Sequence, residues 1–261
     1  KADAAKGKSE FTTALSADGG VFEAGQGAKL SYPDANFPNP VYNYYAVVQR
    51  RDYAISETLT DYLGALADPR VTVFGSSDVG FPYGLTRDDA ISFFNAHTDW
   101  ARLLQGDATP VTKPFYIISS SEIYLARAEA AFRGWTTEAV ADMYEMGISE
   151  NWKQWGIFDQ TAFDIYMQGP NVALGTEADE ELICIQEWLS HYPNGSQGWA
   201  GWRRTGFPGL DPAPGLTQIP RRFAYGLNNY NLNNANTKAA AAQYDVAGDP
   251  DSQLGKVWWD K

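Results

Sequence analysis

The sequence predicts a mainly α-helical protein in which paired helices, similar to tetratricopeptide units, are combined with a large loop-rich, irregular portion. Two observations favour this class. Apolar residues recur at helical spacing in residues 115–190, whereas Gly and Pro interrupt much of the chain on either side. We expect a single domain over residues 1–261. Within it, residues 1–114 form a loop-rich segment, and residues 191–261 form an extended wrap rich in Trp and Arg.

The loop-rich segment contains one clear helix, over residues 56–67. Ser56 is a good N-cap, and Pro69 ends the helical pattern. Between them, four apolar residues recur at the spacing i, i+3, i+4 and i+7: Leu59, Tyr62, Leu63 and Leu66. We also expect an extended run over residues 43–51 and a short helix over residues 88–94.

The helical region begins with a hairpin of two helices between residues 119 and 155. The first helix covers about residues 121–133, and its small Ala side chains allow a partner helix to approach closely. Gly134 fits the left-handed position that follows many helices. Either Thr136 or Thr137 is expected to cap the second helix.

A third predicted helix, over residues 178–190, leads into a stretch without helical periodicity after Pro193. Flexible linkers lack large aromatic side chains, whereas this stretch is rich in Trp and Arg as well as in Pro and Gly. We therefore expect an ordered wrap whose guanidinium groups pair with carboxylates or carbonyls, or lie on aromatic rings. The residues predicted to have this structural role are Trp199, Trp202, Arg203, Arg204, Arg221 and Arg222.

Composition argues against several classes of function. The net charge of −12 disfavours binding of nucleic acid, which requires a positive surface. A single cysteine, Cys184, excludes an internal disulfide, and its Ile neighbours predict a buried, inert thiol. Two His residues are too few for a histidine-rich zinc site. No run approaches the ~20 apolar residues of a membrane-spanning helix, and we expect no cofactor.

Five sequence motifs follow one another along the chain. In order, they are a short helix followed by Asp-Pro-Arg (58–70), a helix ending in Ala-Glu-Ala (120–130), E-x-I-x-x-Q-x-W (181–188), W-x-x-x-R-R-T-G-x-P (199–208), and I-P-R-R-x-x-Y (219–225) with an Asn-rich stretch after it (228–231). This series resembles the SusD/RagB family, in its SusD-like branch of outer-membrane starch- and glycan-binding lipoproteins.

The resemblance implies a non-catalytic protein of the outer membrane and cell surface. Such a protein captures oligosaccharides and passes them to a TonB-dependent transporter of the SusC type, and residues 1–114 would lie on the glycan side. Members of the family are much longer and begin with a lipoprotein signal, whereas this chain begins Lys-Ala-Asp. We therefore expect the C-terminal part of a longer chain, with an N-terminal lipid anchor outside it. We also expect the helix at 121–133 to keep an apolar face that this sequence leaves uncovered.

The best candidate for ligand contact is the loop segment at residues 79–100, which mixes aromatic and polar side chains. In the SusD-like family the glycan face includes loops ahead of the last helix pair, and this segment has the corresponding position. Sugar sites combine a flat aromatic platform with planar polar groups. The predicted stacking residues are Tyr83 and Trp100, and the predicted hydroxyl partners are Asp78, Arg87 and Asn95. The alternative is a small core within the loop, above all for Phe93 and Phe94.

Two other classes of function stay open at this point. One is a helical-repeat module that binds another protein. The other is a glycoside hydrolase, because Glu122 and Glu129 lie on one helix face, although solvated faces explain these carboxylates better and the chain has no HExxH, GxSxG or phosphate-loop motif. Calcium prefers hard oxygen ligands, but the loop carboxylates lack EF-hand spacing, so we predict no metal. These carboxylates are Asp88, Asp89, Asp99 and Asp107.

Overall fold

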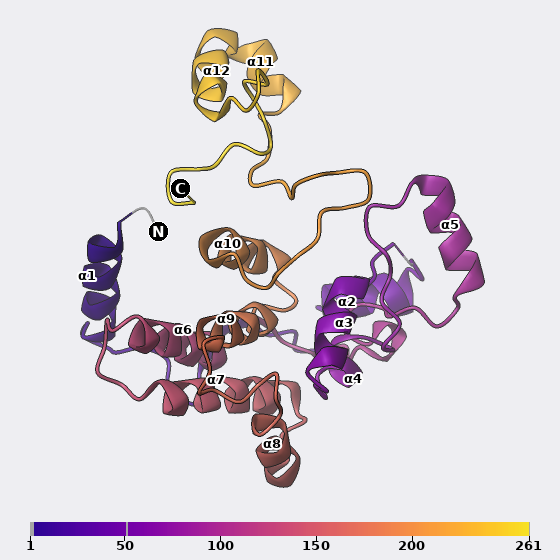
Figure 1. The fold of residues 1–261 in the computed structure, drawn as a ribbon. Helices are drawn as coiled ribbons and strands as arrows, with labels where there is room; N and C mark the ends of the chain where they lie inside the picture. The colour runs from indigo at the N-terminus through magenta and orange to yellow at the C-terminus, as the bar shows by residue number, and fades with distance from the viewer. Residues whose placement is uncertain (1–2, 51, 261) are drawn as a thin grey trace.

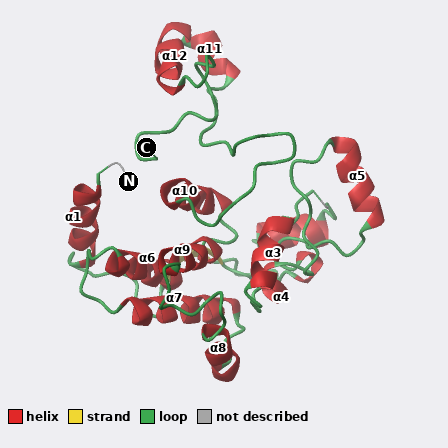
Figure 2. Cartoon of the chain, viewed as in Figure 1, coloured by secondary structure: helices red, strands yellow, loops and turns green. Residues whose placement is uncertain are grey.

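The computed structural model describes residues 3–50 and 52–260. Helices joined by long loops form this part of the chain (Figure 1, Figure 2), which confirms the mainly α-helical class. The first elements are α1 (Ala4–Leu15), β1 (Gly27–Leu30), α2 (Pro40–Tyr42), η1 (Asn43–Val47), α3 (Glu57–Ala65), α4 (Val71–Phe74), α5 (Arg87–Ala96), η2 (Gly106–Ala108) and β2 (Phe115–Ser119). They are followed by α6 (Ser120–Phe132), α7 (Val140–Trp155), α8 (Gln160–Met167), α9 (Asp179–Ser190), α10 (Gly195–Thr205), α11 (Leu227–Leu232), α12 (Asn234–Ala241) and η3 (Ala242–Tyr244).

The centre of the core is formed by α6, α7 and α9, which pack against one another (Figure 1). The first two approach most closely at Gly147, where an added Cβ atom would lie 2.5 Å from Cγ of Leu125. The hydroxyl of Ser121 donates a hydrogen bond of 2.8 Å to the carbonyl of the same glycine. The buried apolar side chains of these three helices include Leu125, Ile148, Trp152, Ile183 and Leu189. Burial of one such side chain stabilises the fold by about 1.5–3 kcal/mol.

The second helix of the pair starts later than the sequence suggests. It begins at Val140, so the prediction that Thr136 or Thr137 caps it is wrong. The connection before it is tied to α6, because Arg127 donates a hydrogen bond of 2.9 Å to Glu138. This ion pair holds the intervening residues against the first helix before the second one begins.

The apolar face of α6 is covered, which corrects the expectation of an open face. Helices α7 and α9 pack against it, and Tyr124 donates a hydrogen bond of 3.0 Å to Glu23, which precedes β1. Among the large apolar side chains of α6, Ile123 is half-buried and Phe132 is exposed, with 42% of it accessible to solvent. Exposed apolar residues instead lie on the antiparallel ribbon of β1 and β2: Leu30, Ile117 and Ile118.

The extended conformation predicted for residues 191–261 is wrong for α11, α12 and η3. It is also wrong for residues 195–205, which form α10. Its glycines lower helix propensity and hide the apolar period. The helix forms because Trp202 is buried, with 8% exposed, and because both ends are capped. Asn194 caps the first turn with its side chain, and Gly206 ends the helix in the left-handed conformation, with φ of 90°.

The extended run predicted for residues 43–51 is also wrong. Residues 43–47 continue α2 as a π-helical turn, η1, in which Tyr45 is buried. Asn39 starts this unit, since its side chain accepts hydrogen bonds from two backbone N–H groups of α2. Arg51 lies outside the described residues.

A buried arginine joins the end of α3 to the core. Arg70 is 0% exposed, and its Nε donates a hydrogen bond of 2.9 Å to Asp68. The same guanidinium donates to Asn151 on α7 at 3.0 Å and to Gln186 on α9 at 2.6 Å. Tyr166 on α8 donates to Asp68 at 2.6 Å. One side chain and its carboxylate partner therefore connect four segments.

Helices α11 and α12 form a lobe at one end of the molecule (Figure 1). The chain enters and leaves this lobe at one place, because the backbone N–H of Arg221 donates to the carbonyl of Gln253 at 2.7 Å. Next to it, Arg222 donates to the carboxylate of Asp251 at 2.7 Å. The two helices bury only Thr237 and Ala241.

Candidate functional site

The loop segment singled out by the sequence is fixed to the start of α3. Phe81 forms a parallel bridge with Ser56, and its backbone N–H donates to the carbonyl of Ile55 at 2.8 Å. The contact is so close that a Cβ atom on Gly80 would lie 2.2 Å from Cα of Glu57. The position of this loop is therefore set by backbone contacts, and glycine is required at its tightest point.

Trp100 is a core residue of this loop, so the expectation that it stacks on a sugar is corrected. Only 2% of it is exposed. Its ring lies 5.9 Å from that of Phe81 and 5.8 Å from that of Phe94, and the guanidinium of Arg102 lies 5.0 Å from its centroid. These contacts leave no ring face for a ligand. The alternative of a small core within the loop describes this residue correctly.

Tyr83 lies at the surface, where 38% of it is exposed. Its hydroxyl donates a hydrogen bond of 2.5 Å to the carbonyl of Asp211. In the same way, the hydroxyl of Tyr62 on α3 donates a hydrogen bond of 2.7 Å to the carbonyl of Gly209. Two tyrosines therefore attach residues 209–214 to the predicted loop.

These contacts enclose a hollow of about 360 Å³, which we call the tyrosine hollow. Two tyrosine rings, three prolines and three carboxylates form its wall, and the described residues that line it include no Lys or Arg. None of the three carboxylates forms an ion pair with another described residue. The lining residues are Glu57, Thr58, Asp61, Tyr62, Pro82, Tyr83, Leu85, Gly209, Asp211, Pro212 and Pro214. Flat rings beside free oxygen acceptors suit a ligand with many hydroxyl groups.

The other predicted contacts lie outside this hollow. Arg87 is the first residue of α5, Asn95 lies near its end, and Asp78 precedes the bridge between Val79 and Trp100. All three predicted polar contacts are exposed, and none lines the tyrosine hollow. The structure therefore does not gather them around Tyr83.

The acidic residues considered for calcium are similarly scattered. Asp88 and Asp89 occupy the first turn of α5, where the side chain of Thr86 caps the helix, and Asp107 belongs to η2. Within residues 3–50 and 52–260, no group of three or more His, Cys, Asp or Glu side chains could hold a metal ion.

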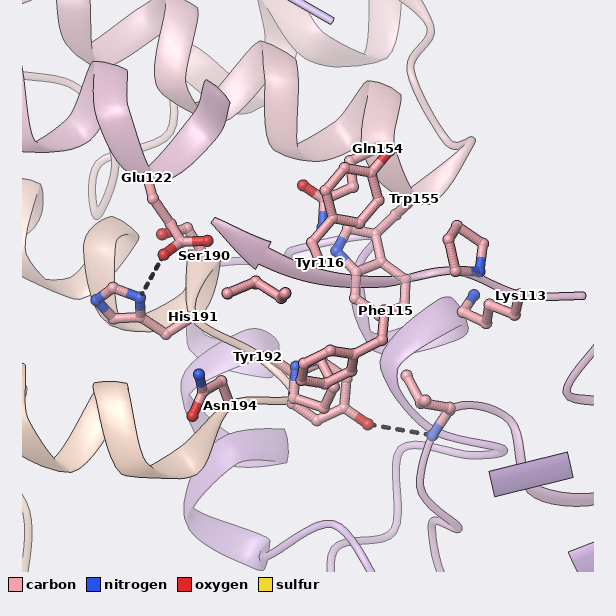
Figure 3. Close-up of a pocket in the computed structure, with 14 residues that line it drawn as sticks. Lys113, Phe115, Tyr116, Glu122, Gln154, Trp155, Ser190, His191, Tyr192 and Asn194 are labelled. Atoms are coloured by element: carbon pink, nitrogen blue, oxygen red, sulfur yellow. Dashed lines mark hydrogen bonds and ion pairs between the residues drawn. The ribbon is translucent and has the colours of Figure 1, made fainter. Parts of the chain in front are cut away.

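A second, smaller cavity of about 110 Å³ lies between β2 and residues 190–194 (Figure 3). We call it the β2 pocket. Aromatic rings of Phe115, Trp155 and Tyr192 line it, together with the ion pair of Glu122 and His191, in which 3.2 Å separate the two side chains. The Tyr192 hydroxyl donates to a backbone carbonyl at 2.7 Å and accepts from a backbone N–H at 3.1 Å. Both ring and hydroxyl of this tyrosine are thus held in place.

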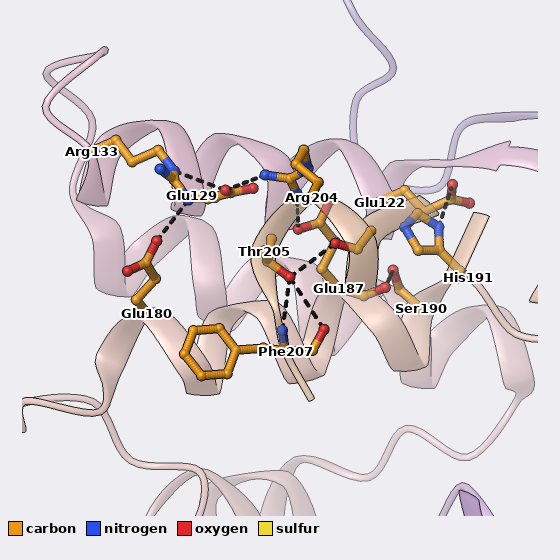
Figure 4. Close-up of polar contacts among 11 residues, drawn as sticks. Glu122, Glu129, Arg133, Glu180, Glu187, Ser190, His191, Arg204, Thr205 and Phe207 are labelled. Carbon is orange, nitrogen blue, oxygen red and sulfur yellow. Dashed lines mark hydrogen bonds and ion pairs between the residues drawn. The ribbon is translucent and has the colours of Figure 1, made fainter. Parts of the chain in front are cut away.

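An ion-pair network fastens α10 to the core (Figure 4). Arg204 binds Glu129 on α6 and Glu187 on α9, and the same Glu129 also pairs with Arg133 at 2.8 Å. Burial raises the pKa of Glu129, but the hydrogen bond and charge of Arg204 outweigh it and leave the pKa lowered. The pKa of Glu187 is raised by burial despite the same arginine, with its neighbour Glu129 adding to the effect.

The three other arginines of the wrap contact carbonyls, carboxylates and rings. Arg203 donates to the carbonyl of Arg221 at 2.8 Å, and its guanidinium lies 3.7 Å from the ring centroid of Trp199. Arg221 binds Asp260 and lies 4.7 Å from the ring centroid of Trp202. The contacts of Arg221 hold the end of the described chain to α10, and the pair of Arg222 with Asp251 holds the base of the α11–α12 lobe.

The carboxylates considered for hydrolysis are engaged in this packing. Glu122 pairs with His191, and Glu129 pairs with two arginines. Neither lines the tyrosine hollow. The carboxylates that do line it were missed from the sequence. Helical spacing places Glu57 and Asp61 on one face of α3, but no local signal shows that Asp211 lies opposite.

Comparison with protein families and solved structures gives a consistent result. Residues 1–226 match a family model described as starch-binding and associating with the outer membrane. A search of the curated proteins found no match. In the described part of the chain, none of the helices has both the length and the apolarity needed to cross a membrane.

Solved structures share the fold. A chitin-binding protein is 25% identical, with a TM-score of 0.76, and the match covers 100% of this chain and 61% of that one. A chitin-binding SusD homologue from Flavobacterium johnsoniae is 23% identical, with a TM-score of 0.78, covering 99% and 59%. A SusD homologue from Bacteroides uniformis is 22% identical, with a TM-score of 0.81, covering 99% and 60%. The chain thus spans about 60% of the length of these proteins.

Proposed function

The chain belongs to the SusD-like family of starch-binding proteins that associate with the outer membrane, and we propose that it binds oligosaccharides at the tyrosine hollow without cleaving them. The observation that carries this proposal is the hollow itself. Exposed Tyr83 stands beside three carboxylates that form no ion pair with any described residue. Aromatic faces pack against the C–H faces of sugar rings, and free carboxylate oxygens accept hydrogen bonds from sugar hydroxyls.

The support of this hollow is suited to recognition. Its floor is α3, and one wall is the loop fixed by backbone hydrogen bonds to that helix. The opposite wall, residues 209–214, is attached by the two tyrosine hydroxyls. A site that is already ordered loses less conformational entropy when a flexible oligosaccharide binds.

The physiological role that we propose is delivery of the bound glycan, at the cell surface, to a TonB-dependent transporter of the SusC type. The family description supports association with the outer membrane. The transporter is the partner that the SusD-like resemblance implies. Isolation of this protein from detergent-solubilised outer membrane, followed by identification of a co-purifying barrel protein, tests this part. Recovery of the protein without such a partner would contradict it.

Calorimetry with malto-oligosaccharides and chito-oligosaccharides tests the binding function, and chromatography of the same mixtures tests for cleavage. We expect binding without new products. Cleavage of the glycan, lost on substitution of one carboxylate, would favour a hydrolase. Absence of glycan binding, with specific binding of a protein partner, would favour a helical-repeat interaction module.

Tyr83→Ala should weaken oligosaccharide binding while the fold survives. A stacking contact of this kind contributes about 0.5–1.5 kcal/mol beyond its buried area, so the Kd should rise at least several-fold. Tyr53→Ala is the matched control, because Tyr53 is 55% exposed and lies outside the hollow. Tyr83→Phe separates the ring from the hydroxyl that contacts Asp211. Equal affinities for Tyr83→Ala and the unaltered protein would show that the oligosaccharide does not bind at the tyrosine hollow.

A further inference from the structure

Two hydrogen-bond donors of the β2 pocket have no acceptor among the residues that the structure describes. Lys113 Nζ lies 4.5 Å from the centroid of the Trp155 ring and forms no ion pair with another described residue. Trp155 Nε1 is buried and lacks a hydrogen-bond partner within the described chain. A buried donor without an acceptor, such as Trp155 Nε1, costs free energy, and the half-buried Lys113 supplies a positive charge beside it. We propose that the β2 pocket binds a small carboxylate, whose oxygens accept hydrogen bonds from Lys113 Nζ and Trp155 Nε1.

The backbone of Lys113 and the ring of Trp155 are held in position before any ligand arrives. The backbone N–H of Lys113 donates to the carbonyl of Pro110 at 3.1 Å, and its own carbonyl accepts from Asn39 at 2.7 Å. The ring of Trp155 packs against those of Phe74 and Tyr192, with centroids 4.8 and 5.6 Å apart. Fixed donors favour binding because little freedom remains to be lost.

The charges around the pocket favour an anion over a neutral carbonyl. Burial lowers the pKa of Lys113, and no carboxylate of the described residues counters this effect. The positive end of α10 opens at Gly195, directly after a residue that lines the pocket. Tyr116 and Tyr192 also line the pocket, and the two remaining titratable groups of the lining, Glu122 and His191, pair with each other and lie on the opposite side of the aromatic rings from Lys113 (Figure 3).

The size of the pocket limits the ligand. A cavity of about 110 Å³ has room for a carboxylate with a short carbon chain, such as propionate, whose apolar end would contact Phe115 and Tyr192. The same chemistry is available from two sources. One is a free short-chain acid, and the other is the carboxylate of a uronic acid unit at the end of a glycan.

The test is a titration of the whole chain with sodium propionate at constant ionic strength. Calorimetry measures the heat of binding, and NMR monitors the indole N–H resonance of Trp155. We expect a Kd of about 1 mM, as befits so small a ligand, and a shift of that resonance on binding. Propionamide, which has the same shape without the charge, should bind at least about tenfold more weakly. In an alkaline buffer near the lowered pKa of Lys113, the bound anion raises that pKa again, so binding should take up protons, which calorimetry in two buffers detects.

Variants separate the pocket from general charge effects. Lys113→Met should weaken propionate binding at least about tenfold, and Lys256→Met, which removes one exposed positive charge elsewhere, should leave it unchanged. Glucuronate in place of propionate distinguishes the two sources, since tighter binding of glucuronate identifies a glycan end. Equal binding of propionate and propionamide, no binding of either acid, or full affinity in Lys113→Met would each overturn the proposal.

Discussion

Arg70→Met tests whether one buried guanidinium holds four segments of the fold together. The Met side chain keeps most of the apolar stem and deletes the charge with all of its donors. Asp68, whose side chain is 0% exposed, then loses its cation. Among the described residues, the hydroxyl of Tyr166 and the backbone N–H of residue 70 remain as its hydrogen-bond donors.

The expected cost follows from this arrangement. Removal of one partner of a buried ion pair lowers the free energy of unfolding by about 3–5 kcal/mol, because the other charge remains buried. The guanidinium also satisfies Asn151 and Gln186, so we expect the upper part of that range. In a chain of this size each kcal/mol lowers Tm by about 2–4 °C. The variant should therefore melt about 8–20 °C lower.

Urea and thermal unfolding, followed by circular dichroism, measure this change. Arg87→Met is the control, because Arg87 is exposed and should shift stability by no more than about 0.5 kcal/mol. In the double variant Asp68→Asn/Arg70→Met, no uncompensated charge is left, so it should be more stable than the sum of the single variants predicts. A loss below about 1 kcal/mol for Arg70→Met, typical of a surface pair, would refute the reasoning.

Three further predictions concern the network around α10 and the buried thiol. Arg204→Ala should lower the free energy of unfolding by about 1.5–3 kcal/mol in urea melts, less than Arg70→Met, because 36% of the Arg204 side chain is exposed. Because the pKa of Glu129 is lowered in the folded protein, its carboxylate stabilises the fold fully above pH about 4.3, the pKa of an unfolded Glu, and this stabilisation is lost as pH falls through the pKa of the folded state. Glu129→Gln should therefore make the free energy of unfolding depend less on pH in the acid range, and an unaltered dependence would contradict this. Burial, with the charges of Glu129 and Glu187, raises the pKa of Cys184 to about 12, so iodoacetamide at mildly alkaline pH should label only the unfolded protein.

The helices predictable from the sequence are those with regular apolar spacing and a local start signal. Ser56 caps α3 as predicted, and the third predicted helix matches α9. Helix α10 has a capping residue in Asn194 but lacks the regular apolar spacing, because glycines interrupt its period and its stability comes from contacts with distant residues. The start of α7 shows the same effect, since the pair of Arg127 with Glu138 overrides two good capping residues.

The sequence predicted one wall of the candidate site, the loop that carries Tyr83, but not the opposite wall. Tyr83 belongs to a loop whose composition suggests recognition, and it does line a hollow. The exposure of Trp100 could not be read from that composition, because it depends on which rings close over it. The opposite wall comes from residues 209–214, whose position depends on two tyrosine hydroxyls rather than on any local pattern.

The two ends of the α11–α12 lobe lie next to each other, so residues 223–250 form an insertion that could be replaced as a unit. Arg221 and Arg222 donate hydrogen bonds to Gln253 and Asp251 at the base of the lobe. These contacts join the two ends of the inserted segment and do not depend on the residues between them. The entropy of closing such a loop grows only with the logarithm of its length, about 0.6 kcal/mol per doubling. The scaffold can therefore exchange this lobe for a longer or shorter one at small thermodynamic cost, which makes it the natural place to graft new sequence.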